Sequence, residues 1–221
     1  VAEGIKEHYF PLNADSETAK SIEGQVVGIA DKIDTICAVF ASGRKPTGSS
    51  DPLGVRRAAL GIIKTILEYD LKLDLSKLIS ESLELLPVKS DCKKDVEEFF
   101  VQRLIIFLNN DYKKTVLEAC AANNPCKDLC DYVKRVNAVS DLDNTALLEN
   151  ANRVLRILKE EVNAEINESL FTFDAEKNLY NEVKKINFTG DYKQYLNSLI
   201  SLNPVVTKFF EDVLVMDNDE K

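Results

Sequence analysis

The sequence has little of the chemistry on which most enzyme motifs depend. It contains one histidine (His8), one methionine, no tryptophan and only eight glycines among 221 residues. A single histidine cannot form the two-histidine zinc motif of metalloproteases, and neither a nucleophile elbow nor a glycine-rich phosphate loop after a strand is present. We interpret His8 as a surface residue at the end of a helix. The common hydrolase and nucleotide-binding motifs are therefore excluded from this chain.

Long apolar runs are also missing. No stretch approaches the roughly 18 consecutive apolar residues that read as a membrane-spanning helix. Val1 opens inside an amphipathic pattern and not in a signal peptide. We therefore predict a soluble, cytoplasmic protein with no membrane partner, and a segment of a longer polypeptide.

The cysteines show no disulfide framework. There are five of them, an odd number, which suits a reducing compartment. Cys126 and Cys130 share a helix face, so a metal is one interpretation of this pair. His8 is more than a hundred residues away, however, and a tetrahedral zinc site would lack a fourth ligand. We predict free thiols and no metal.

Few glycines and prolines, together with many leucines and charged residues, favour a helical protein. Apolar periodicity predicts helices over residues 1–9, 17–42, 52–69, 75–86, 91–108, 111–122, 125–136, 141–158, 174–187, 191–201 and 204–215. Pro87 and the polar residues up to Asp91 are typical of a boundary. We therefore expect an all-α protein with two packed helical domains, residues 1–88 and 89–221. The second is the more acidic, because 17 basic and 24 acidic side chains fall after residue 90, against 11 and 13 before it.

One loop stands out from this helical background. Gly43 can close the helix before it, while Asp51 followed by Pro52 is typical of a helix start. Residues 44–64 carry five basic side chains and one acid in a chain of net charge −9. A cationic patch on an acidic protein indicates an anionic partner.

Arg56 and Arg57 lie in the first turns of the following helix, where the helix dipole disfavours cations. One interpretation is contact with phosphate or carboxylate; the other is that these arginines fold back onto Asp51 and the loop. Asp31 and Asp34 lie three residues apart in the preceding helix. They could be metal ligands, partners of Lys32 and the loop cations, or part of a structural corner that Asp31, Asp34 and Asp51 form with residues 43–57.

The stretch from Pro46 to Ile62, PTGSSDPLGVRRAALGI, resembles a signature of the bacterial glycyl-tRNA synthetase beta subunit family. Three shorter stretches resemble the same family in the same order: EHYFP (7–11), ADKIDT (30–35) and FFEDVLVM (209–216). The sequence departs from the family pattern at Ser50, where lysine is usual, and at Leu53-Gly54-Val55, where Phe-Ala-Leu is usual.

The resemblance implies the C-terminal portion of a beta subunit. Residues 1–88 would belong to an HD-like helical domain, and residues 89–221 to a helical anticodon-binding domain that stops before its last helices. The alpha subunit would carry out ATP- and Mg-dependent glycylation of tRNA(Gly) in an alpha-beta heterotetramer. This segment would be part of that ligase without catalytic residues or a cofactor of its own.

The tRNA-binding candidates are basic residues of the loop and of two later helices: Arg44, Lys45, Arg56, Arg57, Lys134, Arg135, Arg153 and Arg156. Two alternatives stay open. Asp31 resembles the last metal ligand of HD-type phosphohydrolases, although their histidine-bearing segment would lie before Val1. The chain could also be a helical scaffold that binds the alpha subunit or another protein.

Overall fold

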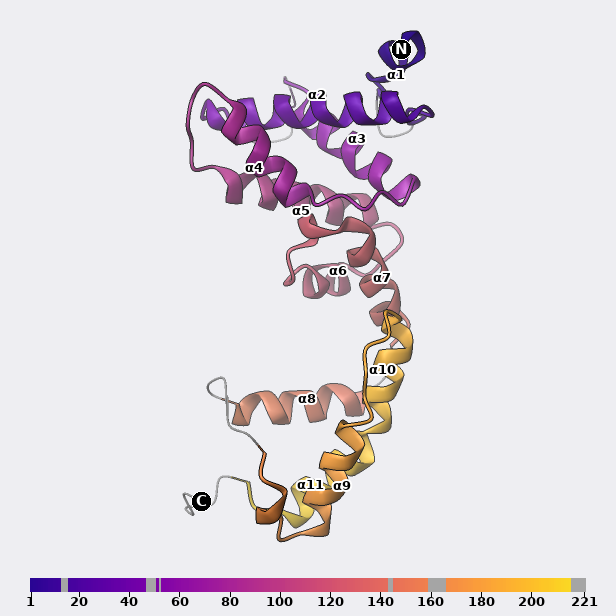
Figure 1. The fold of residues 1–221 in the computed structure, drawn as a ribbon, viewed down its shortest axis with the longest axis vertical. Coiled ribbons are helices and arrows are strands. Elements are labelled where there is room, and N and C mark those ends of the chain that lie inside the picture. The colour runs from indigo at the N-terminus through magenta and orange to yellow at the C-terminus, as the bar shows by residue number, and fades with distance from the viewer. Residues whose placement is uncertain (13–15, 47–50, 52, 143–144, 159–165, 216–221) are drawn as a thin grey trace. The chain divides into compact units, whose positions relative to one another are not determined.

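The computed structural model describes residues 1–12, 16–46, 51, 53–142, 145–158 and 166–215, and this part of the chain is all-helical, as predicted (Figure 1). It divides into two compact units, Val1–Ser140 and Asp141–Lys221, which we call unit 1 and unit 2. None of the described helices is both long enough and apolar enough to cross a membrane.

Unit 1 is built around one long helix. Its elements are α1 (Ala2–Glu7), α2 (Ile22–Ala41), α3 (Val55–Glu68), α4 (Leu75–Leu85), α5 (Lys93–Leu108), α6 (Lys114–Cys120), the short 3-10 helix η1 (Pro125–Lys127) and α7 (Leu129–Ser140). Helix α2 packs against α1, α3, α4 and α5, and Figure 1 shows the last three on one side of it. The second layer, α6 and α7, packs on α5 and α3.

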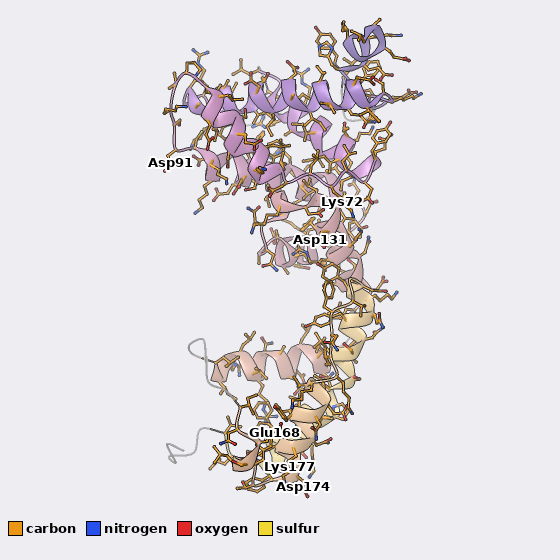
Figure 2. The ribbon with its side chains drawn as sticks, in the orientation of Figure 1. Lys72, Asp91, Asp131, Glu168, Asp174 and Lys177 are labelled. Carbon is orange, nitrogen blue, oxygen red and sulfur yellow. The ribbon has the colours of Figure 1, made fainter. Side chains whose placement is uncertain are left out.

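The core of unit 1 is continuous across the boundary expected at residues 88/89. Buried apolar side chains run from Ile29 in α2 to Val136 in α7. Val96, Phe100 and other residues of α5 lie in the same cluster as those of α2 and α3. Residues 87–91, with Asp91 labelled in Figure 2, are the connection from α4 to α5. The compact units therefore divide at residues 140/141 and not at 88/89.

Unit 2 consists of α8 (Thr145–Ile157), the 3-10 helix η2 (Glu168–Leu170), α9 (Asp174–Val183), α10 (Tyr192–Ser201) and α11 (Asn203–Asp212). Helix α11 packs on α8, α9 and α10. Among the described residues of this unit, Ala175 is the one buried side chain. Polar contacts therefore matter here, such as the amide of Asn150, whose Nδ2 donates to Oδ1 of Asn203 at 3.2 Å.

Several helix starts differ from the sequence prediction. Asp74 caps α4 as expected, since its carboxylate accepts from the backbone N–H of Lys77 at 2.9 Å. Helix α2 is capped by Ser21 instead of Ser16, because the Ser21 hydroxyl accepts from the N–H of Gly24. Helix α3 begins at Val55, three residues later than predicted, and Pro52 lies outside the described residues.

Candidate anion-binding site

The start of α3 is held by an acid that precedes the helix by four residues. Gly54 is the N-terminal flanking residue and has a left-handed backbone (φ +68°), which favours glycine and supplies no side-chain cap. Asp51 replaces that cap: its Oδ1 accepts from the N–H of Arg56 at 3.2 Å, and its Oδ2 from the N–H of Arg57 at 3.3 Å. Both oxygens of this carboxylate are thus bonded to the backbone of α3.

The side chains of the two arginines that follow this cap differ in exposure. Nε of Arg57 also approaches Oδ2 of Asp51 at 3.5 Å, but 62% of the Arg57 side chain is exposed. Arg56 is half-buried. The single carboxylate is therefore shared between the helix N-terminus and Arg57, so it neutralises Arg57 only in part.

A third arginine, Arg103 of α5, lies close enough for the charges of Arg56 and Asp51 to act on it. Burial lowers the pKa of its guanidinium, the neighbouring Arg56 lowers it further, and Asp51 opposes both effects. Arginine nevertheless stays charged at physiological pH. Sequence reasoning missed Arg103 because it lies beside the apolar stripe of α5, and only the packing of α5 on α3 places it near Arg56. We call Asp51, Arg56, Arg57 and Arg103 the α3 corner.

The loop before the corner carries the other two cations predicted there. Gly43 has φ +75° and ends α2, as its position in the sequence indicates. Nζ of Lys45 lies 2.7 Å from Oδ2 of Asp95 at the start of α5, so that charge is paired. The side chain of Arg44 is exposed.

Asp31 and Asp34 do not join this corner. Both are exposed on α2, and within the described residues neither makes a hydrogen bond or ion pair to the 43–57 loop. At 1.5 Å of rise per residue, they lie about 10 to 15 Å back from the end of α2. The structure therefore brings Asp51, but not Asp31 or Asp34, to the arginines.

Lys32, between those two acids, points inward, and the sequence analysis does not predict this structural role. Its Nζ donates to the carbonyl oxygens of His8 at 2.8 Å and Phe10 at 3.1 Å, and burial lowers the pKa of the ammonium. Lys32 thus ties the chain after α1 to the middle of α2. Gly28, one turn earlier, lies so close to the carbonyl of His8 that a Cβ would stand 2.8 Å from its oxygen.

The remaining candidate cations lie elsewhere. Arg135 is held inside unit 1: its Nε donates to Asp131 at 3.0 Å and its Nη1 to the carbonyl of Cys120 at 3.2 Å. Figure 2 labels Asp131 on α7. Lys134 beside it is exposed. The structure thus gives Arg135 a structural role that its sequence position did not reveal.

Two further candidates belong to α8 of unit 2. The guanidinium of Arg153 lies over the ring of Phe210, 4.5 Å from the ring centre, while Arg156 is exposed. Unit 2 also has ion pairs around α9, such as Lys184 with Glu168 at 3.0 Å; Figure 2 labels Glu168. The eight predicted cations therefore lie in three places: the loop before α3 and its first turn (Arg44, Lys45, Arg56, Arg57), α7 (Lys134, Arg135) and α8 (Arg153, Arg156).

All five cysteines are free thiols, four of them buried. Burial raises the pKa of Cys126 to about 12 and that of Cys130 to about 11. Zinc binds the thiolate form, so this environment opposes the metal site considered for the pair. Within the described part of the chain, no three His, Cys, Asp or Glu residues are grouped so that they could hold a metal ion.

Comparison with known proteins identifies similar sequences over the whole chain. Residues 1–122 match the family model described as glycyl-tRNA synthetase beta subunit. The glycine–tRNA ligase beta subunit of Geobacter metallireducens is 37% identical over 100% of this chain, and that of Neisseria meningitidis is 32% identical over 99%. Each alignment covers 34% of the relative, so the chain spans about a third of the length of these proteins.

Proposed function

Because the chain belongs to the glycyl-tRNA synthetase beta subunit family, we propose that it is a tRNA-binding segment of a glycine–tRNA ligase. In this proposal it supports the ATP-dependent glycylation of tRNA(Gly) by an alpha-beta assembly in the cytoplasm. ATP and Mg²⁺ act at sites outside this segment, which contributes RNA contacts and no catalytic group.

The α3 corner is the observation that carries the proposal. It holds three guanidinium groups and one carboxylate in a chain of net charge −9, and that carboxylate is bonded to the backbone of α3. Local positive charge on an acidic protein attracts a polyanion to one place, while the rest of the surface repels it. Arginine forks match phosphate oxygens, and phosphate contacts supply most of the affinity for nucleic acid.

We further propose an anticodon-binding role for the second half of the chain, with residues 141–221 as its compact part. Exposed Arg156, and Arg153 stacked on Phe210, are the candidate RNA contacts in this part. Single-stranded bases stack on aromatic rings and on guanidinium planes, and this pair provides one of each. The assignment of residues 1–88 to an HD-like domain is likewise a proposal and rests on the family resemblance.

A protein-binding role is the second candidate, because unit 1 has an apolar groove. The groove has a volume of about 750 Å³ and is lined mainly by α2 and α4. On its rim, Ile22, Val26 and Leu85 are 73%, 61% and 84% exposed. Such a groove fits contact with another part of the beta subunit or with the alpha subunit. No comparable observation supports the alternative of a phosphohydrolase that uses Asp31 and Asp34.

The test uses the full-length beta subunit with its alpha subunit. We expect Arg56→Glu/Arg57→Glu to weaken binding of tRNA(Gly) at least tenfold. The slope of log Kd against log salt concentration should become smaller by about one to two, because about two phosphate contacts are lost. The double variant Lys77→Glu/Lys114→Glu is the control, because it makes the same charge change at exposed positions of unit 1. Equal tRNA affinity in both variants would refute the proposed site.

A further inference from the structure

One apolar stripe of α2 is covered over only part of its length. Its members recur at spacings of four, three and four residues, which places them on one face of the helix: Ile22, Val26, Ile29 and Ile33. Ile29 and Ile33 are buried, whereas Ile22 and Val26 are exposed. Helix α4 meets α2 near Cys37, whose Sγ lies 3.9 Å from the carbonyl oxygen of Ile79 (Figure 1). Within the described residues, the N-terminal part of the stripe is therefore left open.

This stripe forms one wall of the apolar groove of about 750 Å³. The other apolar side chains that line it come from α4 and from the connection before α4: Leu71, Leu73, Leu78 and Leu85. From Ile22 to Ile33 the wall is about 16 Å long, at 1.5 Å of rise per residue, which equals about three helical turns. Two helices with apolar stripes on either side of a groove are the arrangement in which an amphipathic helix binds.

The polar side chains at the groove are mainly acidic. Among the described residues that line it, Asp34 and Glu81 are acids and Lys72, labelled in Figure 2, is the one cation. Glu81 is 3.8 Å from Nζ of Lys77, and both of these side chains are more than half exposed. Asp34 forms no ion pair with a described residue. These charges favour an occupant with a basic side chain beside its apolar stripe, because complementary charges fix the orientation of a bound helix.

The size of the groove indicates where its occupant comes from. A helix of three turns presents about four apolar side chains, which at roughly 100 Å² each bury about 400 Å² on its own side and about 800 Å² in total. Separate proteins that associate stably bury about 1,200 to 2,000 Å². A segment of the same polypeptide needs less area, because its effective concentration is high. The relatives offer such a segment, since the alignments cover only 34% of their length.

We propose that the groove between α2 and α4 binds an amphipathic helix with a basic edge, supplied by the part of the beta subunit outside residues 1–221. This inference rests on the protein-binding role given as the second candidate function, and it names the partner. The bound helix covers Ile22, Val26 and Leu85 and places a cation beside Asp34 and Glu81. It thereby ties unit 1 to the rest of the subunit.

The test measures alkylation of Val26→Cys by N-ethylmaleimide in the full-length beta subunit, with and without the alpha subunit. Val27→Cys is the matched control, because Val27 is the next residue of α2 and does not line the groove. In an open groove Val26→Cys should react at least as fast, since Val26 is 61% exposed and Val27 48%. We expect it to react about tenfold more slowly in both samples, because a covered thiol reacts only when the helix leaves. Peptide mapping separates the added thiol from the native cysteines.

The basic edge of the occupant is tested by charge reversal in the Val26→Cys background. Asp34→Lys/Glu81→Lys should speed the alkylation about three- to tenfold, because like charges at the groove repel the bound helix. Asp31→Lys/Glu84→Lys makes the same charge change at exposed positions of the same two helices that do not line the groove. Equal alkylation rates in the two double variants would overturn the assignment of a basic partner.

Three outcomes would overturn the source of the helix or the groove itself. Alkylation of Val26→Cys as fast as that of Val27→Cys in both samples would show an open groove. Protection that needs the alpha subunit would assign the groove to that subunit, and protection that rises with the concentration of beta would assign it to a second copy. Photocross-linking from Leu85→p-benzoylphenylalanine should capture a peptide from outside residues 1–221; a peptide from within them would contradict the proposed source.

Transfer RNA affinity keeps this inference separate from the proposed RNA-binding function. Val26→Cys should bind tRNA(Gly) as the wild type does, and Arg56→Glu/Arg57→Glu should leave the protection of Val26→Cys unchanged. An open groove together with weaker tRNA binding by the arginine variant would sink the inference alone. A covered groove together with unchanged tRNA binding by that variant would sink the RNA-binding proposal alone.

Discussion

Removing the carboxylate of Asp51 separates the two roles that the α3 corner combines. In Asp51→Ala, two backbone N–H groups of α3 lose their acceptor, at distances of 3.2 and 3.3 Å in the wild type. Loss of such a cap costs about 1 kcal/mol of folding free energy. Loss of a negative charge at a helix N-terminus adds about 0.5 kcal/mol. The ion pair with Arg57 adds little, because that side chain is 62% exposed.

We therefore expect the free energy of unfolding to fall by about 1.5 kcal/mol, which corresponds to about 5 °C in the melting temperature of a unit of this size. Asp51→Asn should lose about half as much, because its amide oxygen still accepts one hydrogen bond. Urea titration of the full-length protein measures both changes. Asp31→Ala and Asp34→Ala are matched controls, since both acids are exposed on α2 and should change stability by less than about 0.5 kcal/mol.

The expected effect on RNA binding has the opposite sign. Asp51→Ala raises the local net charge by one, so tRNA affinity at low salt should be unchanged or up to about threefold stronger. Weaker binding by a folded variant would refute the assignment of Asp51 to structure alone. An unchanged free energy of unfolding would refute its role as the cap of α3.

Three shorter predictions concern other parts of unit 1. Lys32→Met removes a donor from two carbonyl groups and should cost about 1 to 2 kcal/mol, seen as faster hydrogen exchange at residues 1–12. Arg135→Lys should destabilise the fold by about 1 to 2 kcal/mol without changing tRNA affinity, since lysine lacks the fork that reaches both Asp131 and the carbonyl of Cys120. Weaker RNA binding by a stable variant would instead show that Arg135 is an RNA contact. The raised pKa of Cys126, about 12, means that its thiol stays protonated in the fold while it ionises in the unfolded chain. Below about pH 9 the thiol is protonated in both states, so Cys126 does not make the free energy of unfolding depend on pH. Above pH 9 the unfolded chain loses this proton first, and the free energy of unfolding falls by at most about 1.4 kcal/mol per pH unit. In Cys126→Ala, the free energy of unfolding should therefore fall less steeply between pH 9 and 11.

The sequence predicts the helices well because their signals are local. Apolar spacing indicates α3, and the carboxylate of Asp74 caps α4 as expected. The start of α2 was misplaced because Ser16 and Ser21 are both good capping residues. Ser21 is selected by a contact distant in sequence: its hydroxyl donates to the carboxylate of Glu7 at 2.6 Å, and that bond lowers the pKa of Glu7.

The division of the chain and the third arginine depend on long-range packing. Pro87 and its polar neighbours have the same local appearance in a tight connection and in a domain boundary. Only the burial of α5 side chains such as Phe100 against α2 and α3 decides for the connection. Likewise, nothing in the spacing of Arg103 distinguishes it from any surface cation until α5 lies on α3.

The place of α7 in the core bears on how this region can be isolated. The match to the family model ends at residue 122, yet Leu129, Tyr132 and Val136 lie fully within the apolar core of unit 1. The Tyr132 hydroxyl also donates to the carbonyl of Leu117 at 2.8 Å, across the gap between the two segments. A recombinant fragment cut at the end of the family-model match would uncover that side of the core and lose this buried hydrogen bond. A fragment that keeps the core of unit 1 should therefore extend to Ser140, where this compact unit ends.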